Sequence, residues 1–303
     1  MPEIAQLVDT TWGFKCLAFS PDGRFVAGGR SDDAVWIFDV EKNKKVTAME
    51  ELRKLGQITA IAFMPDGKRL LTGGYTGIVQ VWEFQGGELT AGKQFVGHST
   101  EIKSLACSPD SKFVLSGDRD GRMRYWELET CREQQVWADF QSGAKAAHFL
   151  ADGENALATD GETLFRLNLK TGAVAKTKLD SGSHVAQSAA FSPDGQLLAA
   201  GDGHNVLLWK MASAGEQPRT LGARGEGTVW KVGFSPDAKQ LLTGTRGVVG
   251  IWDLATGNRV TEAQVGPIGY VQTFAVSADG KRLASILSMA RQPLKVFAMP
   301  TGK

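Results

Sequence analysis

The chain has 303 residues, of which 42% are hydrophobic, and its 34 basic and 33 acidic side chains leave a formal net charge of +1. A balanced charge provides no global field that would draw the protein to nucleic acid or to a membrane surface. Cys16, Cys107 and Cys131 are odd in number and form no CxxC pair, which argues against a disulfide or zinc framework.

No apolar run approaches the length of about 18 residues that marks a membrane span, and the first residues form no charged-then-apolar leader. These features favour a cytoplasmic protein, which is either complete or cut from a longer chain. The 36 glycines suit a fold that is rich in turns.

A short apolar segment at residues 4–8 comes first, and a phrase that recurs seven times along the chain follows it. The phrase is Phe-Ser-Pro-Asp-Gly or a close variant, and it favours a tight turn because Pro presets φ and Asp can bond its own backbone. Its aspartates are Asp22, Asp66, Asp110, Asp152, Asp194, Asp237 and Asp279. They are spaced by 42 to 44 residues, and a fixed period of this length is typical of a propeller or a solenoid.

Each period contains three short apolar segments, which predict strands. They are clearest in residues 97–128, where segments 102–107, 113–115 and 123–128 are separated by two turns. The third segment closes on an aromatic residue in every period except the fourth, which has Leu167. The aromatics are Phe38, Trp82, Trp126, Trp209, Trp252 and Phe297. Because each period consists of strands, it predicts one blade of a β-propeller.

The turn phrase, the period and the closing aromatic, with an acid directly after it at Asp39 and Asp253, make the chain resemble the WD-repeat β-propellers over all seven repeats. The resemblance implies an all-β fold: a seven-bladed propeller of four-stranded antiparallel blades. It also implies that residues 4–8 form the outer strand of the last blade, which would remove an exposed sheet edge. A loose N-terminal tail is the alternative. Since no insertion interrupts the repeats, we expect one domain over residues 1–303.

The third repeat carries several polar residues in an otherwise apolar pattern. His98, Ser116, Asp120 and Trp126 fall at positions that resemble the structural tetrad of WD-repeat blades, which implies a hydrogen-bonded chain across the blade. A buried imidazole, hydroxyl and indole N–H each need a partner. A Ser, a His and an Asp could also form a hydrolase triad, but the indole and the repeat context favour the structural role.

Other chemical motifs are weak. The glycines of residues 222–227 have the wrong order for a dinucleotide fingerprint, and residues 118–121 lack the further acids of a calcium loop. His184 and His204 have no third candidate ligand with them, so we expect no metal. The sequence therefore favours a protein that is not an enzyme and needs no cofactor. An enzyme that used the central channel would show ionisable groups with perturbed pKa values at the channel mouth.

A rigid ring without evident chemistry suggests a binding function. In the resembling family, partners dock on the top face, which consists of the connections between blades and the turns between second and third strands. Loops carry most binding residues, and interface centres are rich in Trp, Tyr and Arg. The candidates on these connections are Trp12, Arg30, Tyr75, Arg119, Arg246 and Tyr270. The alternative is that they are ordinary exposed residues.

A second set of candidates comes from the first strand of each repeat. The residues four places before the end of that strand are Lys15, Thr59, Lys103, Lys145, Gln187, Trp230 and Gln272. The resemblance implies that this position lies near the top mouth of the channel, where the three lysines would gather and repel one another. We therefore expect an acidic peptide or protein segment as ligand, with Trp230 as its apolar anchor. A solvated rim without a ligand is the alternative.

The sequence thus predicts a non-catalytic scaffold that binds a partner protein or an acidic peptide on its top face. A sensor or regulatory domain of a larger signalling protein is the first alternative, and an enzyme with its site in the channel is the second. We expect a monomer that does not associate with membranes. The balanced charge disfavours a nucleic-acid ligand, although it does not exclude a local basic patch.

Overall fold

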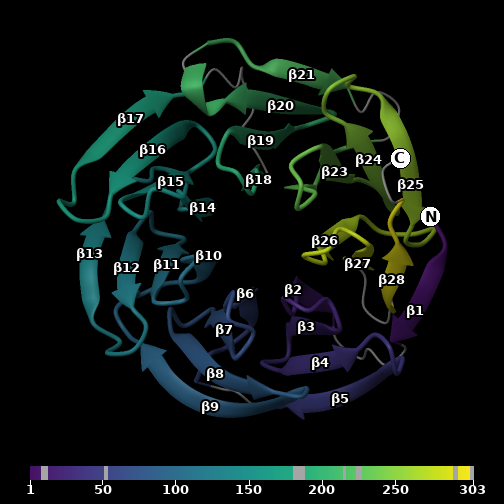
Figure 1. Cartoon of the computed structure of the whole chain (residues 1–303), viewed down its shortest axis with the longest axis horizontal. Coiled ribbons are helices and arrows are strands. Elements are labelled where there is room, and N and C mark those ends of the chain that lie inside the picture. Colours follow the sequence, from purple (N-terminus) through teal and green to yellow (C-terminus); the bar gives the residue numbers. More distant parts are fainter. Residues whose placement is uncertain are drawn as a thin grey trace.

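A computed structural model of the chain describes residues 1–7, 13–50, 54–179, 188–213, 216–222, 227–288 and 293–300. Seven four-stranded antiparallel sheets stand like blades around a central channel (Figure 1). The predicted seven-bladed propeller is therefore confirmed. Among the described residues, the helical segments lack the length and apolar character that crossing a lipid bilayer requires.

Blades one to six each consist of four consecutive strands, which follow one another from the channel outward, and blade seven takes its outer strand from the N-terminus. Blade one has β2 (Phe14–Phe19), β3 (Phe25–Arg30), β4 (Val35–Asp39) and β5 (Lys44–Met49). Blade two has β6 (Ile58–Phe63), β7 (Arg69–Gly74), β8 (Val79–Gln85) and β9 (Glu88–Phe95). Blade three has β10 (Ile102–Cys107), β11 (Phe113–Asp118), β12 (Met123–Glu127) and β13 (Glu133–Trp137). Blade four has β14 (Ala146–Phe149), β15 (Asn155–Thr159), β16 (Thr163–Asn168) and β17 (Val174–Lys178).

The remaining blades follow the same order. Blade five has β18 (Ala189–Phe191), β19 (Leu197–Asp202), β20 (Asn205–Lys210) and β21 (Arg219–Gly222), with the 3₁₀ helix η1 (Met211–Ser213) after β20. Blade six has β22 (Lys231–Phe234), β23 (Gln240–Gly244), β24 (Val248–Asp253) and β25 (Arg259–Gln264). Blade seven has β26 (Val271–Val276), β27 (Arg282–Leu287), β28 (Leu294–Ala298) and, on its outer edge, β1 (Glu3–Leu7).

The recurring turn phrase is a hydrogen-bonded unit between the first two strands of a blade. In blade three, the Ser108 hydroxyl donates to Asp110 over 2.6 Å and accepts the backbone N–H of Phe113 over 2.8 Å. The same serine-to-aspartate bond recurs in blades one, five, six and seven. Because these side chains satisfy backbone groups that the ladder leaves open, the turn sets the register of these five blades at the same point.

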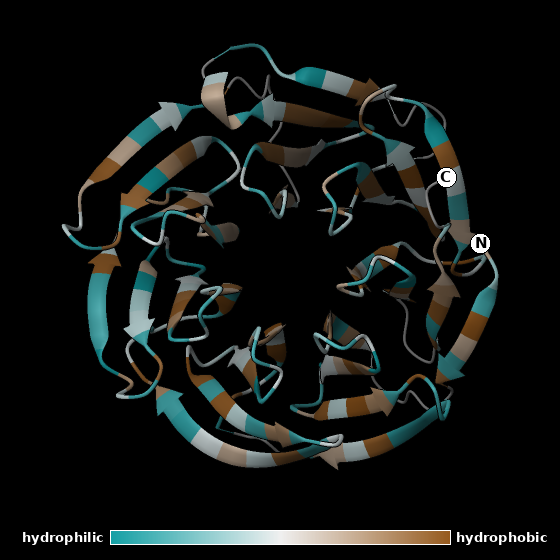
Figure 2. Cartoon of the chain, viewed as in Figure 1, coloured by the Kyte–Doolittle hydropathy of each residue, from teal (hydrophilic) through white to brown (hydrophobic). Residues whose placement is uncertain are grey.

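The closing aromatics of the third strands lie buried between neighbouring blades. Trp126 is 2% exposed, pairs with Val114 of β11 and stacks on Phe95, with ring centroids 5.3 Å apart. Burying a large apolar side chain contributes about 1.5–3 kcal/mol. The outer strands are more hydrophilic, as Figure 2 shows for β13, where only Trp137 is buried. The core therefore lies between the blades and not at the outer rim.

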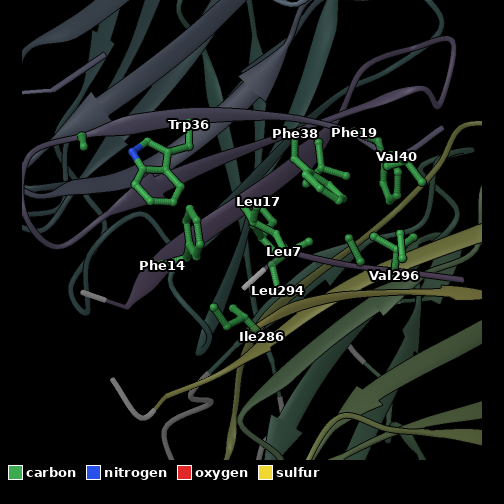
Figure 3. Close-up of a cluster of buried hydrophobic side chains, with 14 residues drawn as sticks. Leu7, Phe14, Leu17, Phe19, Trp36, Phe38, Val40, Ile286, Leu294 and Val296 are labelled. Atoms are coloured by element: carbon green, nitrogen blue, oxygen red, sulfur yellow. The ribbon is translucent and has the colours of Figure 1, made fainter. Parts of the chain in front are cut away.

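The N-terminal strand closes the ring. β1 pairs antiparallel with β28, and Leu7 lies opposite Leu294. Leu7 and Leu294 pack beside Leu17 and Ile286 in a cluster that joins blade seven to blade one (Figure 3). The predicted closure is confirmed for these residues, while Val8 lies outside the described part of the chain. Pairing with β1 removes the free edge that β28 would otherwise expose.

Candidate functional site

A chain of hydrogen bonds crosses blade three from a buried histidine to a buried indole. His98 Nδ1 lies 2.7 Å from Asp118 Oδ2, and His98 Nε2 lies 2.7 Å from Ser116 Oγ. The Trp126 indole N–H donates to the same hydroxyl over 2.8 Å. An indole can only donate, so the Ser116 hydroxyl accepts from it and gives its own proton to Nε2. The imidazole proton therefore sits on Nδ1 and points at Asp118.

The prediction that Asp120 is the acid of this chain is wrong, because Asp118 takes that place. Asp118 lies on β11 two residues after Ser116, so both side chains point to the same face of the sheet. Asp118 is fully buried and also accepts the backbone N–H of Arg122 over 2.8 Å. Asp120 lies beyond the end of the strand, in the exposed part of the turn.

The arrangement suits a structural role better than a catalytic one. Ser116 is fully buried, so a substrate could not reach its hydroxyl. Burial lowers the pKa of His98 below its usual range, against the opposing effect of Asp118. A neutral imidazole with both nitrogens bonded completes the network without leaving an unsatisfied polar group.

Two other blades hold a weaker form of this network, which was not predicted from the sequence. The Trp82 indole donates to the Thr72 hydroxyl over 2.9 Å, and the Trp252 indole donates to the Thr243 hydroxyl over 2.9 Å. The sequence feature that could have predicted these bonds is a hydroxyl residue ten or nine positions before the tryptophan, at the place of Ser116 in blade three. Blades two and six thus keep the indole bond although they lack the histidine.

The top-face candidates differ in exposure. Lys15, Arg119 and Arg246 are exposed, and Tyr75 is 50% exposed, which leaves them open to a partner. Trp12, His184 and Gln187 lie outside the described residues.

Arg30 is the exception among these candidates, because its side chain is only 3% exposed. Its guanidinium binds both carboxylate oxygens of Asp32 and lies 3.8 Å above the Trp36 ring. An arginine held by a carboxylate and an aromatic face fills the core of its own blade. The interpretation of Arg30 as a partner-binding residue is therefore wrong.

Trp230 and Tyr270 form an exposed aromatic pair at the junction of blades six and seven. Their rings stack with centroids 4.4 Å apart and planes 25° apart, and each residue is 37% exposed. Arg246 forms an antiparallel bridge with Tyr270, and Ile268 in the same connection is 56% exposed. We call Trp230, Arg246, Ile268 and Tyr270 the aromatic platform. Both aromatics were candidates from the sequence, but their contact was not predicted.

The central channel contains a cavity of about 320 Å³ that residues from all seven blades line. Lys103 and Lys145 are among these residues, as the register predicted, and Lys103 also binds Glu101 over 2.8 Å. Lys15 and Trp230 do not line the cavity. The neighbour of Trp230, Lys231, does line it, and the sequence did not single out this residue.

A family model for the WD domain, G-beta repeat, matches residues 6–39, 49–83, 90–127, 178–210 and 215–253, which together exceed half of the chain. The chain belongs to the WD40 family. WD40 propellers are commonly used as scaffolds for protein–protein interaction. The matched segments leave out most of blade four, where Leu167 replaces the aromatic, and β26, β27 and β28 of blade seven. The comparison with curated proteins finds no match.

Several ionisable groups that line this WD40 channel are perturbed by burial, which is the feature expected above of an enzyme that used the channel. Desolvation lowers the pKa of Lys145, His148 and Lys231, and it raises the pKa of Cys16 to about 12. The Cys16 thiol donates to the Ile58 carbonyl over 3.6 Å, so it stays protonated and inert. Within the described ranges, no three His, Cys, Asp or Glu side chains converge to hold a metal ion.

Proposed function

We propose that this WD40 protein is a non-catalytic scaffold whose top face binds a partner protein through an acidic segment. The observation that carries the proposal is the stacked pair of Trp230 and Tyr270, in which each residue stays 37% exposed. Large aromatic side chains at the centre of an interface contribute most of its binding energy. Two rings that already support each other lose little freedom on binding.

Charge supports an acidic partner. Trp230 is followed directly by Lys231, so the platform adjoins the cavity that Lys103 and Lys145 also line. No Asp or Glu belongs to the described lining of that cavity. A partner with an apolar residue and nearby carboxylates would fit both features, because opposite charges across an interface guide and orient the encounter.

The state of two candidate nucleophiles supports a role without catalysis, although burial also perturbs Lys145, His148 and Lys231 in the channel. The Ser116 hydroxyl is buried and bonded, and the Cys16 thiol is held protonated. The same features are compatible with a regulatory domain of a larger signalling protein, since such a domain would also act by binding. We favour a scaffold because WD40 propellers are commonly used in that role, and the platform is a docking feature in either context.

The test is affinity capture from source cells with four versions of the intact chain, followed by quantitative mass spectrometry. We expect Trp230→Ala with Tyr270→Ala, and separately Lys103→Glu with Lys145→Glu, to lose the same protein that the wild type captures. Val260→Ala is the matched control, because Val260 is 52% exposed on the outer strand β25, away from the channel.

Thermal midpoints should agree with the wild type within a few degrees, so that lost capture reports lost binding. If both double variants capture the main partner normally, the partner docks elsewhere and the proposal fails.

We further propose that residues 1–303 act as one cytoplasmic domain and as a monomer, without membrane or nucleic-acid ligands. All three cysteines are free thiols, which suits a reducing compartment. A single cooperative unfolding transition and the mass of one chain in solution are the expected results.

A further inference from the structure

One position in the inner strands separates blade six from all the others. It is the residue three places before the start of each turn phrase, and in the ladder it lies opposite the end of the second strand. Six blades place a small side chain there, and blade six places a lysine. The residues are Cys16, Ala60, Ser104, Ala146, Ser188, Lys231 and Thr273.

The small polar side chains at this position bind the backbone of the next blade. The Ser104 hydroxyl donates to the Ala144 carbonyl over 2.7 Å, and the Ser188 hydroxyl accepts the Val232 N–H over 3.3 Å. Lys231 makes no such bond and no ion pair with any described residue, and besides burial only the Cys16 thiol influences the pKa of its amine. Lys231 lines the cavity, so its amine is available there to a ligand.

An unpaired amine in this place weakens the fold. Lys231 is half-buried, and burial lowers the pKa of its amine because the charged form loses water. A buried cation without a counter-charge destabilises a protein. The other six blades show that a small residue can occupy the equivalent position. The lysine is thus better explained by a ligand than by stability.

The wall of the cavity around Lys231 carries positive charge. Its described lining includes three amines, those of Lys103, Lys145 and Lys231, and no carboxylate. Lys103 also binds Glu101, and Asp160 and Glu162 act on the charge of Lys145, whereas Lys231 has no carboxylate partner among the described residues. The rest of the wall is mostly small or neutral, with four alanines on β14 and β18. A volume of about 320 Å³ lies at the lower end of the range for small-molecule sites.

We infer that the central channel binds a small molecule with phosphate or carboxylate groups, which Lys231 holds from one wall and Lys103 and Lys145 hold from the other. Such an anion would supply the counter-charge that Lys231 lacks, and it is small enough for the cavity. This inference is independent of partner docking, because the anion binds to the protein alone.

The experiment is calorimetric titration of the intact protein with pyrophosphate, inorganic phosphate and citrate, at one fixed ionic strength. We expect saturable binding of one molecule per chain for at least one probe. Pyrophosphate and phosphate binding without citrate would identify a phosphate site, and the reverse would identify a carboxylate site. The absence of saturable binding for all three probes would overturn the inference.

Lys231→Met should weaken the binding at least tenfold and should melt at or above the wild-type temperature. The matched control is Lys170→Met, because Lys170 is exposed in an outer turn of blade four and should leave the affinity unchanged. Equal affinity in Lys231→Met and the wild type would overturn the inference.

If Lys231→Met melts below the wild type, Lys103→Met with Lys145→Met provides the deciding measurement. A several-fold loss of affinity in that variant supports the site, and unchanged affinity refutes it. Since no partner protein is present in any of these titrations, their failure is distinct from a failure of the proposed scaffold function.

Discussion

Blades three and five place a tryptophan at the same point of the third strand but treat its indole N–H differently. Trp126 lies opposite Val114 and Trp209 lies opposite Leu198, and both side chains are almost fully buried. The Trp126 indole donates to Ser116, whereas the Trp209 indole has no partner among the described residues, because Ala200 stands where blade three has its serine.

Each of the two blades nevertheless forms a four-stranded sheet with the same strand order. Apolar burial alone is therefore sufficient to place the indole between the blades. The gain from burying a large aromatic is about 1.5–3 kcal/mol, which is similar to the cost of about 1–3 kcal/mol for an unsatisfied buried N–H. The polar network of blade three thus adds stability to an architecture that packing already determines.

The largest effect should come from removing the histidine of the network. We expect His98→Ala to lower the free energy of unfolding by about 3 kcal/mol, because the buried Asp118 carboxyl and the Ser116 hydroxyl each lose a partner. Urea denaturation measures the change. His204→Ala in the exposed turn of blade five is the control and should change stability by less than about 0.5 kcal/mol. Equal effects of the two substitutions would contradict a stabilising network.

The next effect separates the indole bond from indole packing. Trp126→Phe and Trp209→Phe remove similar apolar area, but only the first breaks a hydrogen bond, and the second removes an unsatisfied N–H. We expect Trp126→Phe to be more destabilising than Trp209→Phe by about 2 kcal/mol, measured by denaturant unfolding. A difference near zero would mean that the Ser116 bond adds nothing to the packing.

A gain of stability should follow from giving blade five the missing acceptor. We expect Ala200→Ser to raise the free energy of unfolding by about 1 kcal/mol, because its hydroxyl would lie where Ser116 meets Trp126. Ala199→Ser is the matched control: Ala199 is equally buried but belongs to the opposite face of the strand. If Ala200→Ser destabilises the protein as much as Ala199→Ser, the two blades are not equivalent at this place.

The smallest effect should be a dependence on pH. Burial lowers the pKa of His98 in the folded protein, against the effect of Asp118 and together with that of Arg124, so below pH 6.5 the unfolded chain binds more protons. The contribution of the neutral His98 to the free energy of unfolding is fully present well above that value. It decreases as the pH drops, by less than about 0.7 kcal/mol between pH 7 and pH 6.

His148 contributes in the same direction, because burial lowers its pKa as well. Thermal melts of His98→Gln and His148→Gln should each show a flatter profile than the wild type over this range. An unchanged profile in both variants would show that neither imidazole is held neutral by the fold.

The repeating architecture follows from the sequence alone, because local chemistry determines it. A Pro-Asp turn with its serine satisfies its own backbone within six residues, and an aromatic at a fixed distance marks where the blade must be buried. Seven copies of these signals predict seven blades. The apolar segment before the first copy predicts the closing strand.

Which side chains meet depends on the tertiary structure. Asp118 and Asp120 are two residues apart in one turn, and the point where β11 ends puts the first against His98 and the second in solvent. Trp230 and Tyr270 are 40 residues apart in the chain and touch because blades six and seven are neighbours. Lys231 differs from its six counterparts only when the strands are aligned around the channel. Such contacts depend on the packing of one blade against the next, which no single repeat encodes.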